Sequence, residues 1–173
     1  IYGVTKITGL TEAFGFLVEF GSSTIARIDP DTNNVDSHYL YRGAISDDGI
    51  SKVNQFIYFT SSEDLYVYQA NQDVVRSIAD GVIREEWRAL AEADKLASCV
   101  GYDQRYNFLV IAAGSTIFVN ILPKPVVDTL IADTQAGGAW WVYDVSKTFV
   151  RFVTDLSGAC IGITSAGEAY ELF

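Results

Sequence analysis

The chain has 173 residues, of which 49% are hydrophobic, and its 22 acidic and 12 basic residues give a net charge of −10. This length and apolar content predict one domain, spanning 1–173, with a hydrophobic core rather than a disordered chain. The acidic balance disfavours adhesion to nucleic acid, because binding to phosphates needs clustered Lys and Arg, but it leaves room for a role beside DNA that passes without sticking. No apolar run approaches the roughly 20 residues that span a bilayer.

The first clear element is a β-hairpin. Segments 16–20 and 24–28 are rich in β-branched and aromatic residues and flank a short break of Gly and Ser, a pattern typical of a hairpin. The same layout returns at 55–69, 108–119 and 160–172. These intervals of about 40 to 50 residues are the period of blade-repeat β-proteins. We therefore predict an all-β, blade-repeat (β-propeller-like) fold of antiparallel sheets.

A polar run at 29–34 follows the first hairpin. Its acidic and amide residues alternate like the first oxygen ligands of a calcium-binding loop, but Asn34 and Leu40 stand where that loop needs glycine and glutamate. We therefore interpret 29–34 as an ordinary turn. His38, the single histidine, lies in the next predicted strand. Because no metal ligand or triad partner is near it in the sequence, we interpret it as an exposed strand residue.

Apolar runs bounded by turn residues predict strands along most of the chain. They are 15–20, 24–28, 35–41, 50–53, 56–60, 64–69, 97–103, 107–112, 116–120, 139–144, 148–153, 159–164 and 168–172, with a further strand within 1–9. Apolar residues are consecutive in several of them, which indicates sheets covered on both faces. We expect 139–144 and 148–152 to pair as a hairpin that forms half of the last blade, and the strands to make about three blades.

One helix, near 78–94, is predicted between the second and third repeats, packed beside the sheets as an insertion. Ser77 is its expected N-cap. Its expected apolar stripe, at helical spacing, consists of Ile83, Trp87, Leu90 and Ala91. We interpret Trp87 as a core residue rather than a binding residue.

Candidate chemical groups are few. Cys99 and Cys160 each lie in a predicted strand, and we interpret them as buried free thiols. Adjacent acidic residues, as at 47–48 and 85–86, diverge instead of converging on a substrate. With one histidine, no phosphate-binding glycine loop and no spacing typical of metal ligands, the chain is predicted not to be an enzyme. We predict no catalytic, cofactor-binding or metal site and no cofactor.

Two stretches are candidates for contact with a partner or ligand. The connection 121–138, with Pro123 and Pro125, suits a subunit contact, because connections longer than about 12–15 residues without regular structure are usually functional or contact a partner. Trp140 and Trp141 offer rings for stacking on a sugar. Adjacent residues of a strand point to opposite faces, so at most one lines a given pocket, and we interpret both as packed between neighbouring sheets.

The composition also suggests a longer parent chain. The sequence contains no methionine, begins at Ile1 within an apolar stretch and ends at Phe173 directly after another. A natural chain of this length usually holds a few methionines, the initiator included. We therefore expect 1–173 to be a partial propeller domain and a piece of a longer polypeptide.

An ordered set of short motifs runs from 43 to 173. They are Gly43-Ala44-Ile45-Ser46, Tyr58-Phe59-Thr60-Ser61, Leu65-Tyr66-Val67-Tyr68, the helix, Val100-Gly101-Tyr102-Asp103, Val142-Tyr143-Asp144, Thr164-Ser165 and Tyr170-Glu171-Leu172. This order resembles the propeller region of tail nozzle and packaged-DNA-stabilisation proteins of short-tailed bacteriophages.

The resemblance implies a structural virion protein of the phage tail or neck, made in the host cytoplasm. Its implied partners are copies of itself in a ring, neighbouring tail, neck or portal-adaptor proteins, and DNA that passes through a channel without specific binding. No membrane contact and no catalytic residue is implied. An acidic channel wall would offer phosphates no counterion-releasing contacts. The alternative is a propeller-type binding module for a carbohydrate or protein ligand.

Overall fold

The computed structural model describes residues 6–40, 42–122 and 139–173. Within these residues, fifteen strands form four antiparallel sheets. The first sheet comprises β1 (Ile7–Ala13), β2 (Phe16–Gly21), β3 (Thr24–Asp29) and β4 (Asn34–Leu40), and the second comprises β5 (Ile50–Val53), β6 (Phe56–Thr60), β7 (Leu65–Gln69) and β8 (Val74–Ser77). The third comprises β9 (Cys99–Asp103), β10 (Phe108–Ala113), β11 (Thr116–Ile121) and β12 (Trp140–Asp144), and the fourth comprises β13 (Phe149–Thr154), β14 (Cys160–Thr164) and β15 (Ala169–Glu171).

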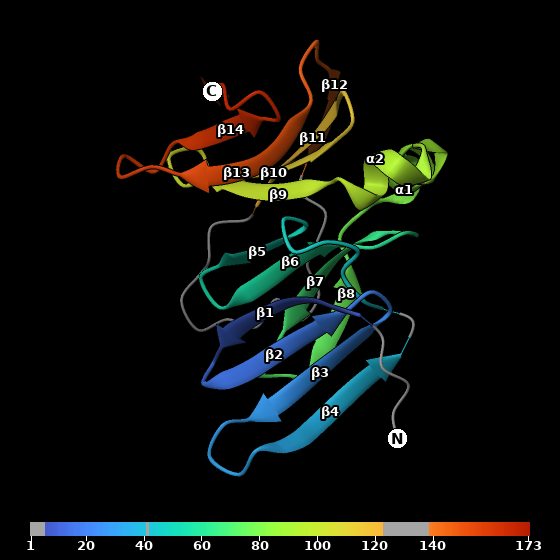
Figure 1. Cartoon of the computed structure of the whole chain (residues 1–173), viewed down its shortest axis with the longest axis vertical. Coiled ribbons are helices and arrows are strands. Elements are labelled where there is room, and N and C mark those ends of the chain that lie inside the picture. Colours follow the sequence, from blue (N-terminus) through green and yellow to red (C-terminus); the bar gives the residue numbers. More distant parts are fainter. Residues whose placement is uncertain (1–5, 41, 123–138) are drawn as a thin grey trace.

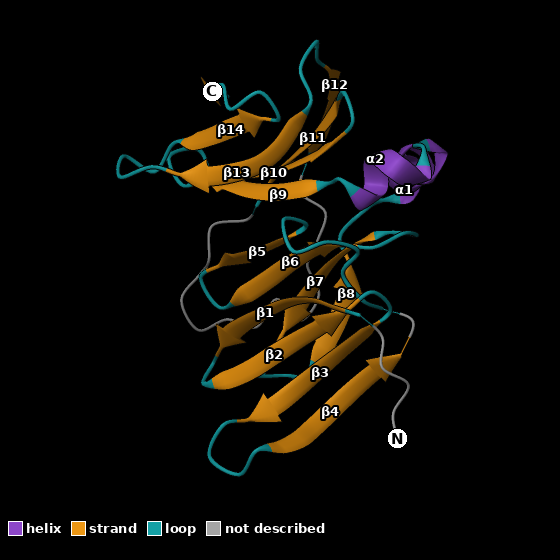
Figure 2. Cartoon of the chain, in the orientation of Figure 1, coloured by secondary structure: helices purple, strands orange, loops and turns teal. Residues whose placement is uncertain are grey.

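The four sheets follow one another in chain order, as blades do. Figure 1 shows β1–β4 at the bottom, the second sheet above them and the third and fourth sheets together at the top, and Figure 2 shows that strands dominate the chain. The first strand of each sheet is the one nearest its neighbours, because β1 contacts β5, β5 contacts β9, and β9 contacts β13. The predicted all-β, blade-repeat (β-propeller-like) architecture is therefore confirmed.

The repeated hairpin of the sequence occupies the same place in the strand order of each sheet. The four copies are β2–β3, β6–β7, β10–β11 and β14–β15, the second and third strands of their sheets. The central strands β6 and β10 are buried along almost their whole length. Their consecutive apolar residues therefore face covered surfaces on both sides, as predicted.

Apolar side chains from successive sheets form three buried clusters. Phe20 of the first sheet meets Phe59 of the second, with ring centroids 5.1 Å apart. The second cluster joins the second and third sheets. The third joins the third and fourth sheets around Cys99, Phe149 and Cys160. Each cluster therefore holds one sheet to the next.

The predicted helix is two short helices, α1 (Gly81–Ala89) and α2 (Glu92–Leu96). The N-cap is Asp80 rather than Ser77, because the Asp80 carboxylate accepts the backbone N–H of Ile83 at 2.9 Å. Leu90 adopts an extended conformation (ψ 149°) and ends α1. No helix in the described part of the chain is long and apolar enough to span a bilayer.

Trp87 is the core residue of the insertion, as predicted, and is fully buried. Its indole N–H donates to the backbone oxygen of Ser61 at 2.9 Å, and its ring meets Phe118 edge-on. Ile83 is buried beside it. Ala91 is exposed, so the predicted apolar stripe is wrong at its last position, where the chain has already left α1.

Three further predictions about the strands are wrong. The described residues form four sheets rather than about three blades. The short strand β8 was not predicted, and β1, from Ile7 to Ala13, extends past the strand expected within 1–9, of which 1–5 lie outside the described residues. The segments 139–144 and 148–152 do not pair, because β12 bonds to β11 while β13 bonds to β14. The segment between them crosses from one sheet to the next, anchored where the Val145 N–H donates to the Ser115 oxygen at 2.8 Å.

Candidate functional site

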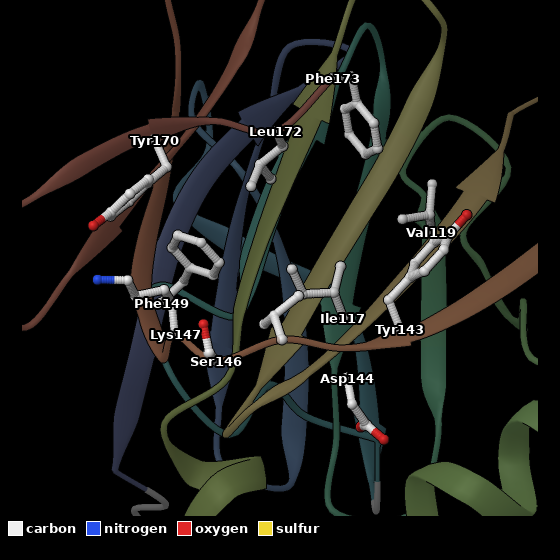
Figure 3. Close-up of a pocket in the computed structure, with 11 residues that line it drawn as sticks. Ile117, Val119, Tyr143, Asp144, Ser146, Lys147, Phe149, Tyr170, Leu172 and Phe173 are labelled. Carbon is white, nitrogen blue, oxygen red and sulfur yellow. The ribbon is translucent and has the colours of Figure 1, made fainter.

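A pocket of about 470 Å³ lies between the third and fourth sheets. One wall comes from β11 and β12, and the other from β13, β15 and the residues after β15. The lining consists of Ile117, Val119, Tyr143, Asp144, Val145, Ser146, Lys147, Phe149, Tyr170, Leu172 and Phe173 (Figure 3). We call this site the β15 pocket.

The pocket lies between two sheets that differ in their number of described strands. The first three sheets each have four described strands, whereas the fourth ends at β15 with three. The outer strand of the third sheet, β12, therefore has no described strand packed over it from the fourth. Tyr143 of β12 is 50% exposed and Trp141 is 39% exposed.

The floor of the pocket is apolar. Ile117 and Val119 of β11 and Phe149 of β13 are buried. Leu172 packs against the same cluster and, in Figure 3, points into the space between Phe149 and Ile117. Such a floor favours aliphatic or aromatic groups of a ligand, because it removes them from water.

The polar groups at one end of the pocket are already paired with one another. Lys147 forms an ion pair with Glu168 at 3.1 Å, and the Tyr170 hydroxyl donates to the same Glu168 carboxylate at 2.9 Å. The hydrogen bonds from Tyr170 and Lys147 lower the pKa of Glu168. Asp144, which also lines the pocket, accepts the hydroxyl of Thr116 at 3.1 Å.

The lining of the β15 pocket is mostly apolar. Among residues 6–40, 42–122 and 139–173, no three His, Cys, Asp or Glu side chains gather as a metal site would require. The side chains that line the pocket combine a large apolar surface with two charged groups, Asp144 and Lys147. That combination is typical of a recognition site.

The two cysteines are free and buried, as predicted. They lie in β9 and β14, on facing sides of the third buried cluster. Burial raises the pKa of both Cys99 and Cys160 to about 12. At neutral pH both are therefore protonated, and their role is packing.

The two tryptophans point to opposite faces of β12, as predicted. Trp140 packs against the cluster between the second and third sheets, and its indole N–H donates to the Ile78 oxygen at 3.2 Å. Trp141 is on the other face, partly exposed and edge-on to Phe108. The interpretation that both are packed between sheets holds for Trp140 and is wrong for Trp141.

The other residues singled out in the sequence do not gather at the pocket. The backbone of His38 lies in β4, and 29–34 links β3 to β4, with the Asp31 N–H donating to the Asp29 carboxylate at 2.8 Å. Asp48 forms an ion pair with Arg151 at 2.7 Å. Of the connection 121–138, the part from 123 onward lies outside the described residues.

The sequence did not indicate the β15 pocket. Tyr143 and Leu172 were recognised only as parts of strands and of the motifs that carry the family resemblance. The available signal was that Trp141 and Tyr143 fall on one face of β12 by the period of two, so that both rings would be exposed unless another sheet covered that face. The erroneous β12–β13 hairpin concealed this signal.

No family model matches the sequence, and neither does any curated protein. The fold is similar to Kluyveromyces lactis Hsv2 at 9% identity, covering 97% of this chain and 61% of that chain, with a TM-score of 0.40. A second structure of that protein, with a complete loop 6CD, gives 9% identity, 97% and 60% coverage and a TM-score of 0.38. Dihydro-heme d1 dehydrogenase NirN in complex with DHE gives 15% identity, 94% and 43% coverage and a TM-score of 0.42. The chain thus spans less than two thirds of each of these structures, and its architecture is established by its own sheets.

Proposed function

We propose that the chain is a propeller-type binding module that holds an apolar segment of a protein partner in the β15 pocket. The observation that supports this proposal is the pocket itself, an apolar hollow of about 470 Å³ beside exposed Tyr143. Pockets of this size and lining take up apolar side chains, and burying one such side chain contributes roughly 1.5–3 kcal/mol.

A protein ligand fits this site better than a carbohydrate. A sugar needs several free hydrogen-bonding groups around its ring, together with an aromatic face. Here the Lys147, Glu168 and Tyr170 side chains are engaged with one another. The exposed ring of Trp141 does not line the pocket.

The test uses a library of random peptides displayed against the purified chain, in parallel with a glycan array. We expect peptides rich in aliphatic and aromatic residues to be enriched and no glycan to bind. Leu172→Asp should weaken the enriched peptides at least tenfold, because a carboxylate would occupy the apolar floor. The matched control is Val82→Asp, at an α1 position that is 65% exposed and remote from the pocket.

Two outcomes would refute the proposal. One is enrichment of glycans without peptides. The other is peptide binding that Leu172→Asp and Val82→Asp weaken equally, since the pocket would then have no special part in binding. A circular-dichroism melt of both variants confirms that each is folded before binding is compared.

A role in a phage tail or neck assembly is the second candidate function. The observation that favours it is exposed apolar residues on both terminal sheets. Ile7, Leu10 and Val35 are exposed in the first sheet, and Val153 and Leu156 in or beside β13 of the last. Such surfaces are suited to contacts with further blades, neighbouring virion proteins or copies of this chain in a ring.

The tail role and the associated DNA channel, virion location and absence of catalysis stay predictions. Mass spectrometry of purified virions tests the location, and absence of the parent protein from them would contradict it. Tight DNA binding by the parent protein at physiological salt would contradict passage without specific binding.

A further inference from the structure

We infer that Asp80 and Gly81 form a site of spontaneous modification, at which the Asp80 carboxyl group cyclises onto the Gly81 nitrogen and the ring reopens as isoaspartate. The modified residue is a substrate for the class of methyltransferases that act on isoaspartyl carboxylates. This inference lies outside the β15 pocket and does not depend on the proposed function.

The sequence contains two Asp-Gly pairs, at 48–49 and 80–81. Glycine after aspartate favours ring closure, because no side chain hinders the approach of its backbone nitrogen and its backbone turns freely. The two pairs have the same local chemistry. Any difference between them in the folded chain therefore comes from their surroundings.

The nitrogen of Gly81 is open to reaction. Asp80 and Gly81 are both exposed, and Gly81 is the first residue of α1. The first N–H groups of a helix have no partner within it, and in the described part of the chain no hydrogen bond engages the Gly81 N–H. A Cβ added at Gly81 would meet no atom within 4 Å. The ring therefore has room to form.

The Asp80 carboxyl group is held beside that nitrogen. Its Oδ1 accepts the backbone N–H of Ile83 at 2.9 Å, which keeps the carboxyl group over the first turn of α1. This hydrogen bond draws electron density from the carboxyl carbon and stabilises the oxyanion that forms when the nitrogen attacks. The ψ angle of Asp80 is 179°, which brings the Gly81 nitrogen nearer to the Asp80 Cβ than the ψ of a β-strand would.

The pair at 48–49 is protected. Gly49 is buried, and its N–H donates to the Ser46 hydroxyl at 3.0 Å. The Asp48 carboxylate accepts the Arg151 guanidinium at 2.7 Å. A Cβ added at Gly49 would lie 2.4 Å from the Thr60 hydroxyl oxygen. The nitrogen, the carboxylate and the space around them are therefore all occupied.

The reaction has two steps, and water is its sole co-reactant. The Gly81 nitrogen bonds to Cγ of Asp80 and gives its proton to solvent, while one carboxyl oxygen leaves as water, so that a cyclic succinimide remains. Water then adds to the Asp80 backbone carbonyl and breaks its bond to the Gly81 nitrogen. The main chain now runs through the former side-chain carbon, which is isoaspartate. Addition of water at Cγ instead restores aspartate.

The modification acts on the N-terminus of α1. Isoaspartate adds one carbon to the main chain at the N-cap and displaces the acceptor of the Ile83 N–H. α1 carries three donors that hold the turn 61–64 between β6 and β7, namely Trp87, Arg84 and Arg88. Isoaspartate at position 80 therefore loosens the helix that fixes this turn.

The experiment ages the purified chain at neutral pH and compares the two pairs in one sample. Trypsin places them in separate peptides, 77–84 and 43–52, and electron-transfer fragmentation distinguishes isoaspartate from aspartate. We expect isoaspartate to form at least about tenfold faster at Asp80 than at Asp48, because the Gly49 hydrogen bond must break before its nitrogen can attack. In a chain unfolded in urea the two rates should become similar, since the protection at 48–49 is then lost.

Gly81→Ala tests the attacking nitrogen. Alanine fits the open space at this position and favours the helix, and a circular-dichroism melt confirms that the variant is folded. We expect isoaspartate at Asp80 to form at least about fivefold more slowly, because the new methyl group hinders the approach of the nitrogen. Amide hydrogen exchange in α1 should be faster in the aged chain than in the fresh chain, and unchanged by ageing in Gly81→Ala.

Three outcomes would overturn the inference. They are equal rates at Asp80 and Asp48 in the folded chain, a faster reaction at Asp48, and no isoaspartate in peptide 77–84. Each of them leaves the proposed function untouched, because that function is tested by peptide binding at the β15 pocket.

Discussion

Asp103 joins the third sheet to the fourth, and its replacement by asparagine is the sharpest test of how the pocket walls are held together. Its carboxylate is fully buried at the end of β9. One oxygen accepts the backbone N–H groups of Arg105 and Tyr106 at 3.0 and 3.2 Å. The other accepts the Arg105 guanidinium at 2.9 Å and the backbone N–H of Cys160, in the fourth sheet, at 3.0 Å.

Asp103→Asn puts an amide group where one of these acceptors was. The asparagine oxygen still serves the two N–H groups of the turn, but its NH₂ group then faces the Cys160 N–H and the guanidinium, which are both donors. Arg105 is partly exposed and can turn to water, whereas the buried Cys160 N–H loses its acceptor. One buried donor without a partner and the lost charge-assisted bond together cost about 2–3 kcal/mol.

Urea unfolding followed by tryptophan fluorescence measures this loss, which corresponds to a melting temperature about 5–10 °C lower for a domain of this size. The matched control is Glu171→Gln, which removes the other ion pair of Arg105, at 2.6 Å to a carboxylate that is 53% exposed. We expect the control to move the midpoint far less, because exposed pairs contribute little. Equal shifts for the two variants, or an unchanged midpoint for Asp103→Asn, would refute the reasoning.

The same carboxylate has a defined pH dependence. Burial by itself would raise the pKa of Asp103, but hydrogen bonds from Arg105, Cys160 and Tyr106 outweigh it and hold the pKa below its ordinary value of 3.8. The folded state therefore binds the proton less tightly than the unfolded state does. The stabilisation is fully present above pH 3.8 and is lost as the pH falls through the lower, folded-state pKa. Asp103→Asn should flatten that part of the stability profile.

Three further predictions concern the core. Trp87→Phe should lower the free energy of unfolding by about 1–3 kcal/mol in the same urea assay, because the buried Ser61 oxygen loses its donor. A loss under about 0.5 kcal/mol would contradict this. Cys99 and Cys160 should resist iodoacetamide at pH 8 in the folded chain and react once the chain is unfolded in urea, because burial raises the pKa of both to about 12. Equal alkylation rates in the two states, measured by mass spectrometry, would show that the thiols are accessible. Gly162→Ala should lower the free energy of unfolding by about 1–3 kcal/mol, because the new methyl group would lie 2.5 Å from a ring carbon of Phe149 in the adjacent strand. An unchanged melting temperature would show that the ring moves freely.

The sequence by itself determined the strands, the repeated hairpins and the burial of individual side chains. Runs such as 56–60 alternate with turn residues at a regular period, so the strands and the repeated hairpins could be predicted from neighbouring residues alone. The opposite orientations of Trp140 and Trp141 followed from the period-two geometry of a strand. Burial of Cys99 and Cys160 followed from their apolar surroundings in the sequence.

Only the tertiary structure decided which strands belong to the same sheet. Strands β12 and β13 are close in sequence, and their pattern is typical of a hairpin. In the structure, however, β12 pairs with β11 and β13 pairs with β14. The β15 pocket depends on that choice, because it lies where β12 extends beyond the last described strand of the next sheet. Asp103 could not be recognised either, since its decisive partner, the Cys160 N–H, is 57 residues away in the chain. Contacts between such distant residues are set by the packing of whole sheets, which no local pattern of side chains records.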